Sequence, residues 1–305
     1  MNRVIITGAT GAIGTALIEE FVKEGIEVLV FCRKGSPRNH KIPNDPLVSK
    51  EYCSLDEFET KQNNTGKKFD VFYHLAWDGT TGIARDDMYL QNRNVKYALD
   101  AVEMAKRFGC HTFVGAGSQA EYGRVQGLLS SDTPVSPENG YGIAKLCAGL
   151  MTRELAHQIG LKHIWMRILS VYGPNDGAQS MVMSTIYKLK NGEIPKFTKG
   201  EQMWDYLYSG DAAKAFALVG KKGKDGKVYI LGSGYARPLA EYITEIRDVV
   251  KPEAAIALGA IPYRPQQVMF LQADNENLIH DTGWKPETPF KKGIENILER
   301  DIHNE

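Results

Sequence analysis

Short apolar runs and amphipathic stretches alternate from the start of the chain. Residues 3–7 and 27–32 are apolar runs rich in β-branched side chains, which favours strands. Between them, apolar residues recur at the spacing of one helix face from Ile13 to Val22, and Gly25 is placed to end that helix. A strand, a helix and a strand over about 30 residues predict a parallel pair joined by a right-handed crossover.

The same alternation continues to about residue 172. Near-continuous apolar runs predict strands that are buried on both faces, and the amphipathic stretches between them predict helices. The further predicted strands are 69–76, 111–117 and 162–169, and the further predicted helices are 92–108 and 141–159. Strand–helix alternation of this length predicts an α/β fold with a doubly wound parallel (Rossmann) sheet.

After residue 172 the alternation becomes irregular, and prolines and turns are frequent. In this part, 211–220 still predicts a helix and 228–232 a strand. We therefore expect a smaller, irregular C-terminal α/β portion over the carboxyl edge of the sheet, where open α/β sheets bind ligands. The predicted boundaries are 1–172 for the Rossmann domain, with 205–235 returning to it, and 173–204 together with 236–305 for the substrate-binding portion.

The first predicted strand runs directly into a turn with three glycines, Gly8, Gly11 and Gly14, which opens the first helix. Glycine permits a tight turn and lets a phosphate approach the unpaired N–H groups of a helix N-terminus. A tight turn without a ligand could carry the same spacing. Its place at the first crossover of a doubly wound chain favours dinucleotide binding. We expect Gly8 to form the turn, Gly11 to admit the diphosphate and Gly14 to let the helix pack on the strand.

The second predicted strand is followed by Arg33. In dinucleotide-binding sheets an acidic residue near this position holds the ribose 2′-hydroxyl of NAD, whereas an arginine suits the 2′-phosphate of NADP. Arg38 is placed to assist. A solvated basic turn is the alternative interpretation. We expect NADP as the cofactor, in preference to NAD.

A phenol and an ammonium group lie one helical turn apart at Tyr141 and Lys145, in the predicted helix 141–159. A nearby cation lowers the pKa of a tyrosine, which then serves as an acid or base near neutral pH. This spacing alone occurs by chance, so its context matters. Ser118 directly follows a predicted strand and would face the same cleft. Ser118, Tyr141 and Lys145 are the candidate catalytic residues.

Composition and charge narrow the possible partners. Lysine plus arginine and aspartate plus glutamate each number 37, so charge gives no reason to expect nucleic acid or an anionic membrane as a partner. No apolar run has the roughly 18 residues of a membrane span, and no signal peptide precedes the first strand. The four cysteines have no metal-ligand spacing, so we expect no metal site and a cytoplasmic location.

Six segments together resemble one family, the NAD-dependent epimerase/dehydratase family of extended short-chain dehydrogenases/reductases, which acts on nucleotide sugars. The likeness covers almost the whole chain, and GSQAEYG and VYGP are its more specific parts. The segments are TGATGAIG (7–14), HLAW (74–77), GSQAEYG (117–123), YGIAK (141–145), RILSVYGP (167–174) and RPQQV (264–268).

The resemblance implies a role for each matching residue. Ser118 would hydrogen-bond the sugar oxygen, Tyr141 would exchange the proton, and Lys145 would hold the nicotinamide ribose and lower the pKa of Tyr141. Arg264 would grip the diphosphate of the sugar nucleotide, and Asn94 would support the site. The implied cofactor-binding residues are Gly8, Thr10, Gly11, Ala12, Ile13, Gly14, Arg33, Leu75, Ala76, Trp77, Asn94, Tyr141, Lys145 and Ile168. The implied substrate-binding residues are Ser118, Gln119, Tyr141, Trp204 and Arg264.

Departures from the family pattern refine the expected reaction. Gln119 and Ala120 stand where family dehydratases place an acidic pair, which argues against dehydration. Trp204 replaces a usual arginine and Ser170 a common asparagine. We expect an NADP-dependent enzyme that reduces a 4-keto group of a nucleotide sugar or epimerises a 4-hydroxyl through a transient ketone. The alternatives are a reductase of a small non-nucleotide carbonyl and a catalytically silent cofactor-sensing protein.

The helices predicted at 92–108 and 141–159 carry more apolar residues than one buried face needs. The resemblance implies a homodimer through these two helices, with Leu150 or Met151 near the interface. The alternative is that the C-terminal portion of the same chain covers the excess apolar surface.

Overall fold

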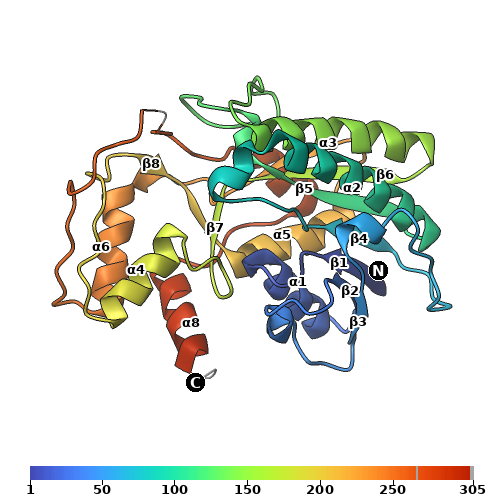
Figure 1. Cartoon of the computed structure of the whole chain (residues 1–305), viewed down its shortest axis with the longest axis horizontal. Coiled ribbons are helices and arrows are strands. Elements are labelled where there is room, and N and C mark those ends of the chain that lie inside the picture. Colours follow the sequence, from blue (N-terminus) through green and yellow to red (C-terminus); the bar gives the residue numbers. More distant parts are fainter. Residues whose placement is uncertain (266, 303–305) are drawn as a thin grey trace.

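The computed structural model describes residues 1–265 and 267–302, and its centre is a seven-stranded parallel sheet (Figure 1). The strand order is β10-β6-β5-β4-β1-β2-β3, so the chain reverses its winding direction between β1 and β4. The strands are β1 (Arg3–Thr7), β2 (Glu27–Cys32), β3 (Val48–Tyr52), β4 (Val71–His74), β5 (Thr112–Ser118), β6 (Lys162–Ile168) and β10 (Val228–Leu231). The carboxyl ends of β1 and β4 therefore flank the crevice in which such sheets bind ligands.

Helices cover both faces of the sheet, because successive strand residues point to opposite sides. Val4 and Ile6 pack on one face against α1, α5 and α7, whereas Ile5 and Phe72 pack on the other face against α2 and α3. Figure 1 shows α2 and α3 side by side along one face and α1 and α5 along the other. The helices are α1 (Ala12–Lys23), α2 (Met88–Arg107), α3 (Gly140–Gln158), α5 (Ser209–Lys222) and α7 (Glu276–Thr282). The predicted α/β class and doubly wound sheet are confirmed.

Most predicted elements lie within a few residues of their expected bounds, but β3 was not predicted. None of the five residues of β3 is fully buried, because it is the edge strand of the sheet. Its sequence VSKEY therefore lacks the apolar run that marks the inner strands.

The second lobe is more helical than the irregular portion expected from the sequence. It contains α4 (Met181–Lys190), α6 (Leu239–Val250) and α8 (Phe290–Ile302), which share an apolar core around Tyr172. The short strands are β7 (Ser170–Tyr172) parallel to β9 (Tyr206–Tyr208), and β8 (Met203–Trp204) antiparallel to β11 (Arg237–Pro238). Short 3₁₀ helices are η1 (Asn39–Lys41), η2 (Leu55–Glu57), η3 (Gly82–Asp86) and η4 (Gln119–Glu121). Figure 1 shows this lobe beside the sheet.

Candidate active site

The glycine turn joins β1 to α1, and two of its glycines are required by backbone packing. Gly8 has a φ of +73°, and a Cβ on it would lie 2.6 Å from the carbonyl carbon of Leu75. A Cβ on Gly14 would lie 2.3 Å from the Gly8 oxygen, whereas one on Gly11 would meet nothing closer than 3.7 Å. Gly8 and Gly14 thus bring strand, helix and β4 together, and Gly11 leaves open space for a ligand.

The N-terminus of α1 has the donors that an anion needs. Gly11 occupies the N-cap position, and no side chain caps the helix. The first N–H groups of a helix have no partner within it, and the helix dipole places positive charge there. Thr10 and Gly11 line the adjoining cavity, and Ala12 begins the helix. This cradle fits a diphosphate.

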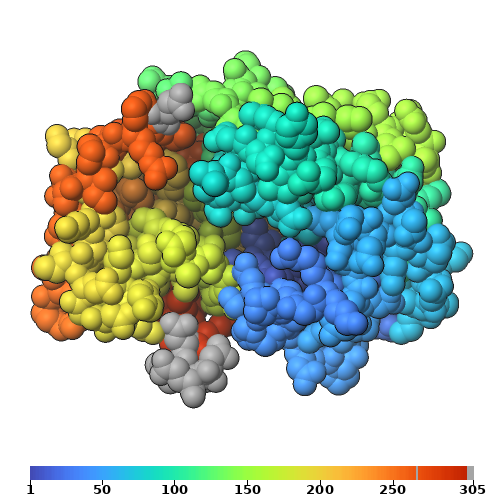
Figure 2. Space-filling model, viewed as in Figure 1, coloured from blue at the N-terminus to red at the C-terminus, as the bar shows by residue number. Residues whose placement is uncertain are grey.

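The adjoining cavity has a volume of about 250 Å³ and runs from the glycine turn to the end of β2. Figure 2 shows the surface hollowed at this place, with the N-terminal segment, in dark blue, at the bottom of the hollow. Leu75, Ala76 and Trp77 form one wall, and Arg33 and Arg38 lie at the β2 end. The structure therefore brings seven of the fourteen expected cofactor-binding residues to the lining of one cavity.

The two arginines at this cavity have different surroundings. Arg33 is exposed, and its Nη1 lies 3.9 Å from a carboxylate oxygen of Asp78. Arg38 Nη2 donates to the carbonyl oxygens of Thr10, at 2.9 Å, and of Asn175, at 3.2 Å. Arg38 thereby links the glycine turn to the loop after β7.

Ser118 and Tyr141 meet where β5 ends and α3 begins. Asn139 caps α3 by accepting a hydrogen bond from the Gly142 N–H at 2.8 Å. A Cβ on Gly142 would lie 2.3 Å from the Ala120 oxygen, so only glycine lets this turn of α3 pack on η4. Burial raises the pKa of Tyr141, a hydrogen bond with the Ser118 side chain lowers it, as does the charge of Arg85, and Glu121 raises it.

Lys145 lies one helical turn after Tyr141 and is buried, and its ammonium group is directed toward Ala116 and Trp77. Its Nζ donates to the Ala116 oxygen at 2.6 Å and lies 3.7 Å from the centroid of the Trp77 ring. It is 5.8 Å from the centroid of the Tyr141 ring. Burial lowers the pKa of Lys145 to about 7, although the charge of Glu121 raises it. The sequence led us to expect that Lys145 lowers the pKa of Tyr141, but in this arrangement burial dominates and the pKa of Tyr141 is raised.

Glu121 is a buried residue of the site that our sequence reasoning did not single out. Its Oε1 accepts hydrogen bonds from the Ser118 N–H at 2.8 Å and from Trp165 Nε1 at 3.0 Å. Its Oε2 accepts from Arg167 Nε at 2.7 Å. Ser118 and Glu121 form the two ends of a capping box. The pattern Ser-x-x-Glu was visible in the sequence and could have identified this pair.

Asn94 supports the loop after β4. Its side chain bonds both backbone groups of Asp78, accepting from the N–H at 3.0 Å and donating to the oxygen at 2.9 Å. Gln91 accepts from Trp77 Nε1 at 2.8 Å. Ile13 and Ile168 are half-buried and pack against the core beneath the site. Asn94 and Gln91 therefore hold the Trp77–Asp78 part of the cavity wall in place.

The expected substrate-binding residues are only partly brought together. Gln119 lines a second cavity, of about 240 Å³, together with Arg85 and Asn139. Trp204 Nε1 donates to the Ser170 hydroxyl at 2.8 Å, so the two departures from the family pattern contact each other. Arg264 is exposed, and within the described part of the chain it lines neither of these cavities. Residue 266, in the motif 264–268, lies outside the described residues.

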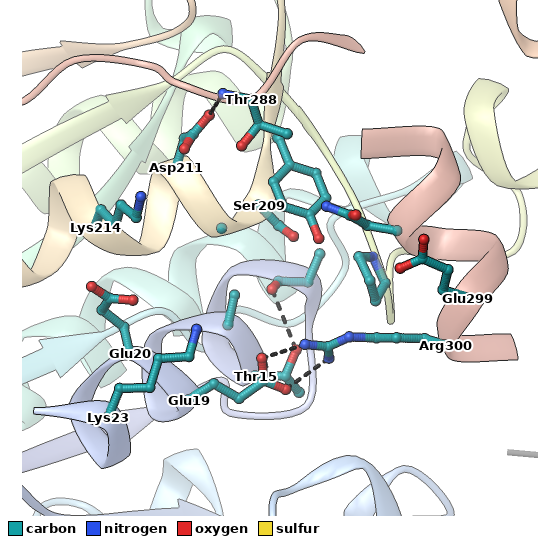
Figure 3. Close-up of a pocket in the computed structure, with 16 residues that line it drawn as sticks. Thr15, Glu19, Glu20, Lys23, Ser209, Asp211, Lys214, Thr288, Glu299 and Arg300 are labelled. Carbon is teal, nitrogen blue, oxygen red and sulfur yellow. Dashed lines mark hydrogen bonds and ion pairs between the residues drawn. The ribbon is translucent and has the colours of Figure 1, made fainter. Parts of the chain in front are cut away.

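Another cavity, of about 470 Å³, lies between α1, α5 and α8 (Figure 3). Several of its charged side chains form ion pairs. Arg300 binds Glu19 through two hydrogen bonds, at 2.7 and 2.5 Å, and Lys214 pairs with Glu287. It contains none of the candidate catalytic residues. In the described ranges, 1–265 and 267–302, no helix combines the length and the hydrophobicity that a membrane crossing requires.

The sequence of this chain is similar to those of known proteins. The model of the NAD dependent epimerase/dehydratase family matches residues 4–232. CDP-abequose synthase of Salmonella typhimurium is 26% identical, over 97% of this chain and 97% of its own length.

Two solved structures share the fold. UDP-glucuronic acid 4-epimerase from Bacillus cereus, in complex with UDP-glucuronic acid and NAD, has a TM-score of 0.84 at 19% identity and covers 99% of this chain and 100% of its own. RMD from Pseudomonas aeruginosa, complexed with NADPH, has a TM-score of 0.80 at 20% identity and covers 98% of both chains. The fold, the glycine turn and the family match together confirm the resemblance, and this chain belongs to the NAD-dependent epimerase/dehydratase family of short-chain dehydrogenase/reductase enzymes.

Proposed function

We propose that this enzyme is an NADP-dependent oxidoreductase of nucleotide-linked sugars, which reduces a 4-keto group or epimerises a 4-hydroxyl through a transient ketone. The observation that carries the proposal is the convergence of Ser118, Tyr141 and Lys145 at the carboxyl edge of the sheet, beside a cavity that starts at the glycine turn. The names of CDP-abequose synthase and of the UDP-glucuronic acid 4-epimerase support a nucleotide sugar as the substrate. A nicotinamide cofactor is common to the family.

The proposed chemistry assigns one task to each side chain. When bound, the nicotinamide supplies or accepts the hydride. The Ser118 hydroxyl would orient the substrate oxygen, and the Tyr141 phenol would exchange a proton with it. Lys145 lies next to Trp77, at the end of the cofactor cavity, and would hold the nicotinamide ribose. Gln119 and Ala120 offer no carboxylate for the removal of water.

The proposed preference for NADP rests on the basic end of the cofactor cavity. Arg33, Ser36, Arg38 and Asn39 line it, and two guanidinium groups with neighbouring hydroxyl and amide donors suit a 2′-phosphate. A 2′-phosphate would compete with Asp78 for Arg33. NADP in turn favours the reductase, because an epimerase returns the hydride that it removed and needs no external supply of reduced cofactor.

The decisive experiment separates the two reactions. The purified protein is incubated with NADPH and a nucleoside diphosphate 4-keto-6-deoxyhexose, and separately with UDP-glucose or UDP-galactose and either cofactor. Loss of NADPH absorbance matched by formation of a 4-hydroxy sugar supports the reductase. Interconversion of the two UDP-sugars without net change in the cofactor supports the epimerase.

The same experiment tests the two alternatives. Reduction of small carbonyl compounds without any turnover of nucleotide sugars would replace the proposal with a small-carbonyl reductase. Cofactor binding without turnover of any of these substrates would replace it with a cofactor-sensing protein. The Tyr141→Phe variant is the control for turnover that does not use this site.

We also propose a homodimer through α2 and α3. Ile143, Leu150 and Met151 on α3 are 50%, 47% and 45% exposed, so the second lobe of the same chain does not cover them. Exposed apolar side chains clustered on one helix favour an interface. The four cysteines are free thiols, which fits the cytoplasm as the proposed location.

A further inference from the structure

Arg85 lies over the candidate proton donor, although nothing in its sequence surroundings singled it out. It belongs to η3, in the loop between β4 and α2, and its guanidinium carbon is 4.2 Å from the centroid of the Tyr141 ring. Its Nη1 donates to the Thr80 oxygen at 3.1 Å. Gln91 Nε2 holds the same loop by donating to the oxygens of Gly79, at 2.9 Å, and Ala84, at 2.8 Å. The position of Arg85 is therefore fixed from both sides.

Three charged groups from three elements surround the Tyr141 phenol. They are Arg85 from η3, Lys145 from α3 and Glu121 from η4. Lys145 is 5.8 Å from the ring centroid, and its ammonium group is engaged by the Ala116 oxygen and the Trp77 ring. Glu121 is paired with Arg167. Of the two cations, Arg85 is the closer to the ring of Tyr141.

We propose that Arg85 is a positioning residue that acts through Tyr141, where its guanidinium group stabilises the negative charge left on the phenol after proton transfer. This inference rests on the proposed function. A cation over the face of an aromatic ring is attracted by the ring, and the attraction grows when the ring carries a negative charge. The charge of Arg85 lowers the pKa of Tyr141 against the effect of burial, which agrees with the geometry.

The proton and electron balance shows where this charge arises. In the reduction, a hydride from the reduced nicotinamide forms the new C–H bond at C4, and the electron pair of the carbonyl moves to its oxygen. That oxygen takes the proton of the Tyr141 hydroxyl, whose O–H bond breaks, and a phenolate remains. Solvent then returns a proton to Tyr141. In the reverse direction the phenolate is the base that removes the alcohol proton.

The test compares Arg85→Gln and Arg85→Lys with a matched control, Arg124→Gln. Arg124 lines the same cavity as Arg85 and Gln119, but it is exposed and paired with Glu138 at 2.7 Å. The rate of the oxidative direction is measured against pH for each variant. We expect Arg85→Gln to shift the rise of this rate upward by about 1 pH unit. Arg85→Lys keeps the positive charge and should shift the rise of this rate by less than Arg85→Gln does. Arg124→Gln should leave the pH profile unchanged.

A second measurement does not need turnover. The ultraviolet absorbance of the phenolate is titrated in the protein with bound NADP, and the same titration of Tyr141→Phe is subtracted to isolate Tyr141. Arg85→Gln should move this titration upward by the same amount. If the wild type turns over no nucleotide sugar, the proposed function fails while this titration still tests Arg85. An unchanged titration in Arg85→Gln, or an equal shift in Arg124→Gln, would overturn the inference. A raised KM with an unchanged pH profile would also overturn it.

Discussion

The Nε of Arg167 lies 2.7 Å from Oε2 of Glu121, and both side chains are buried beneath the candidate active site. The same carboxylate also binds the backbone N–H of Ser118 and the indole N–H of Trp165. The buried carboxylate of Glu121 therefore links Trp165 and Arg167 of β6 to Ser118 at the end of β5.

Replacement of Glu121 by alanine should be strongly destabilising. It leaves the Arg167 guanidinium buried without its partner and removes the acceptor of two further donors, which costs about 3–5 kcal/mol in the free energy of unfolding. Denaturant unfolding measures the loss. Glu138→Ala is the control, because Glu138 forms an exposed pair with Arg124 and its removal should cost less than about 1 kcal/mol. Equal losses of unfolding free energy in the two variants would contradict the structural role of Glu121.

Tyr141→Phe should abolish hydride transfer while cofactor binding is nearly retained. The ring still packs against Trp77, but the proton carrier is gone, and the loss of a positioned acid–base group lowers the rate by on the order of 10²–10⁴. Single-turnover kinetics and cofactor titration measure the two effects. Near-normal turnover would remove Tyr141 from the mechanism. Lys145→Met should weaken both cofactor binding and rate, since its proposed role includes both.

Arg33→Asp should shift the cofactor preference from NADP toward NAD. A carboxylate at this place repels a 2′-phosphate and accepts a hydrogen bond from a 2′-hydroxyl. Dissociation constants for the two cofactors, measured by titration of wild type and variant, give the change in preference. A wild-type protein that already prefers NAD would show that the charge of Arg33 was misread. Lys34→Asp supplies a control with the same charge change at a neighbouring residue that does not line the cofactor cavity.

The buried Lys145 should make stability rise with pH. Its pKa is lowered to about 7 in the folded protein, first by burial, from 10.5 for the free side chain. Between these values the unfolded chain binds more protons than the folded one, so the free energy of unfolding increases with pH through this window. The stability of the cofactor-free wild type relative to Lys145→Met should therefore be greater at pH 10 than at pH 7. A difference that stays constant or falls would contradict the lowered pKa of Lys145.

A homodimer should form through the exposed apolar face of α3. Sedimentation equilibrium at micromolar concentration should give twice the chain mass of 33.9 kDa. The double variant Leu150→Arg and Met151→Arg should sediment as a monomer, because two cations would have to be buried at the interface. Tyr187→Arg is the control, since Tyr187 is 65% exposed on α4 in the second lobe. If the double variant still sediments as a dimer, the interface does not include this face of α3.

The sequence by itself determined the architecture around the cofactor site. The strand–turn–helix at residues 3–23 follows from local periodicity and from three glycines, of which Gly8 and Gly14 are required by backbone packing and Gly11 leaves open space. The inner strands could be predicted from their apolar runs, because helices cover both faces of these strands. Tyr141 and Lys145 were identifiable because one helix fixes their spacing, and the Ser-x-x-Glu pattern that includes Glu121 was equally legible.

Tertiary structure alone decided which charges surround the reacting groups. Arg85 and Tyr141 lie far apart in sequence on different elements, and only the packing of η3 against α3 brings the guanidinium over the ring. The partner of Glu121, which belongs to η4, is Arg167 on β6, and the ammonium group of Lys145 is directed to Ala116 and Trp77. Electrostatic shifts depend on burial and on distances in space, neither of which local periodicity encodes. The sequence could therefore identify Tyr141 as the candidate proton donor, and the fold sets the pKa of its phenol.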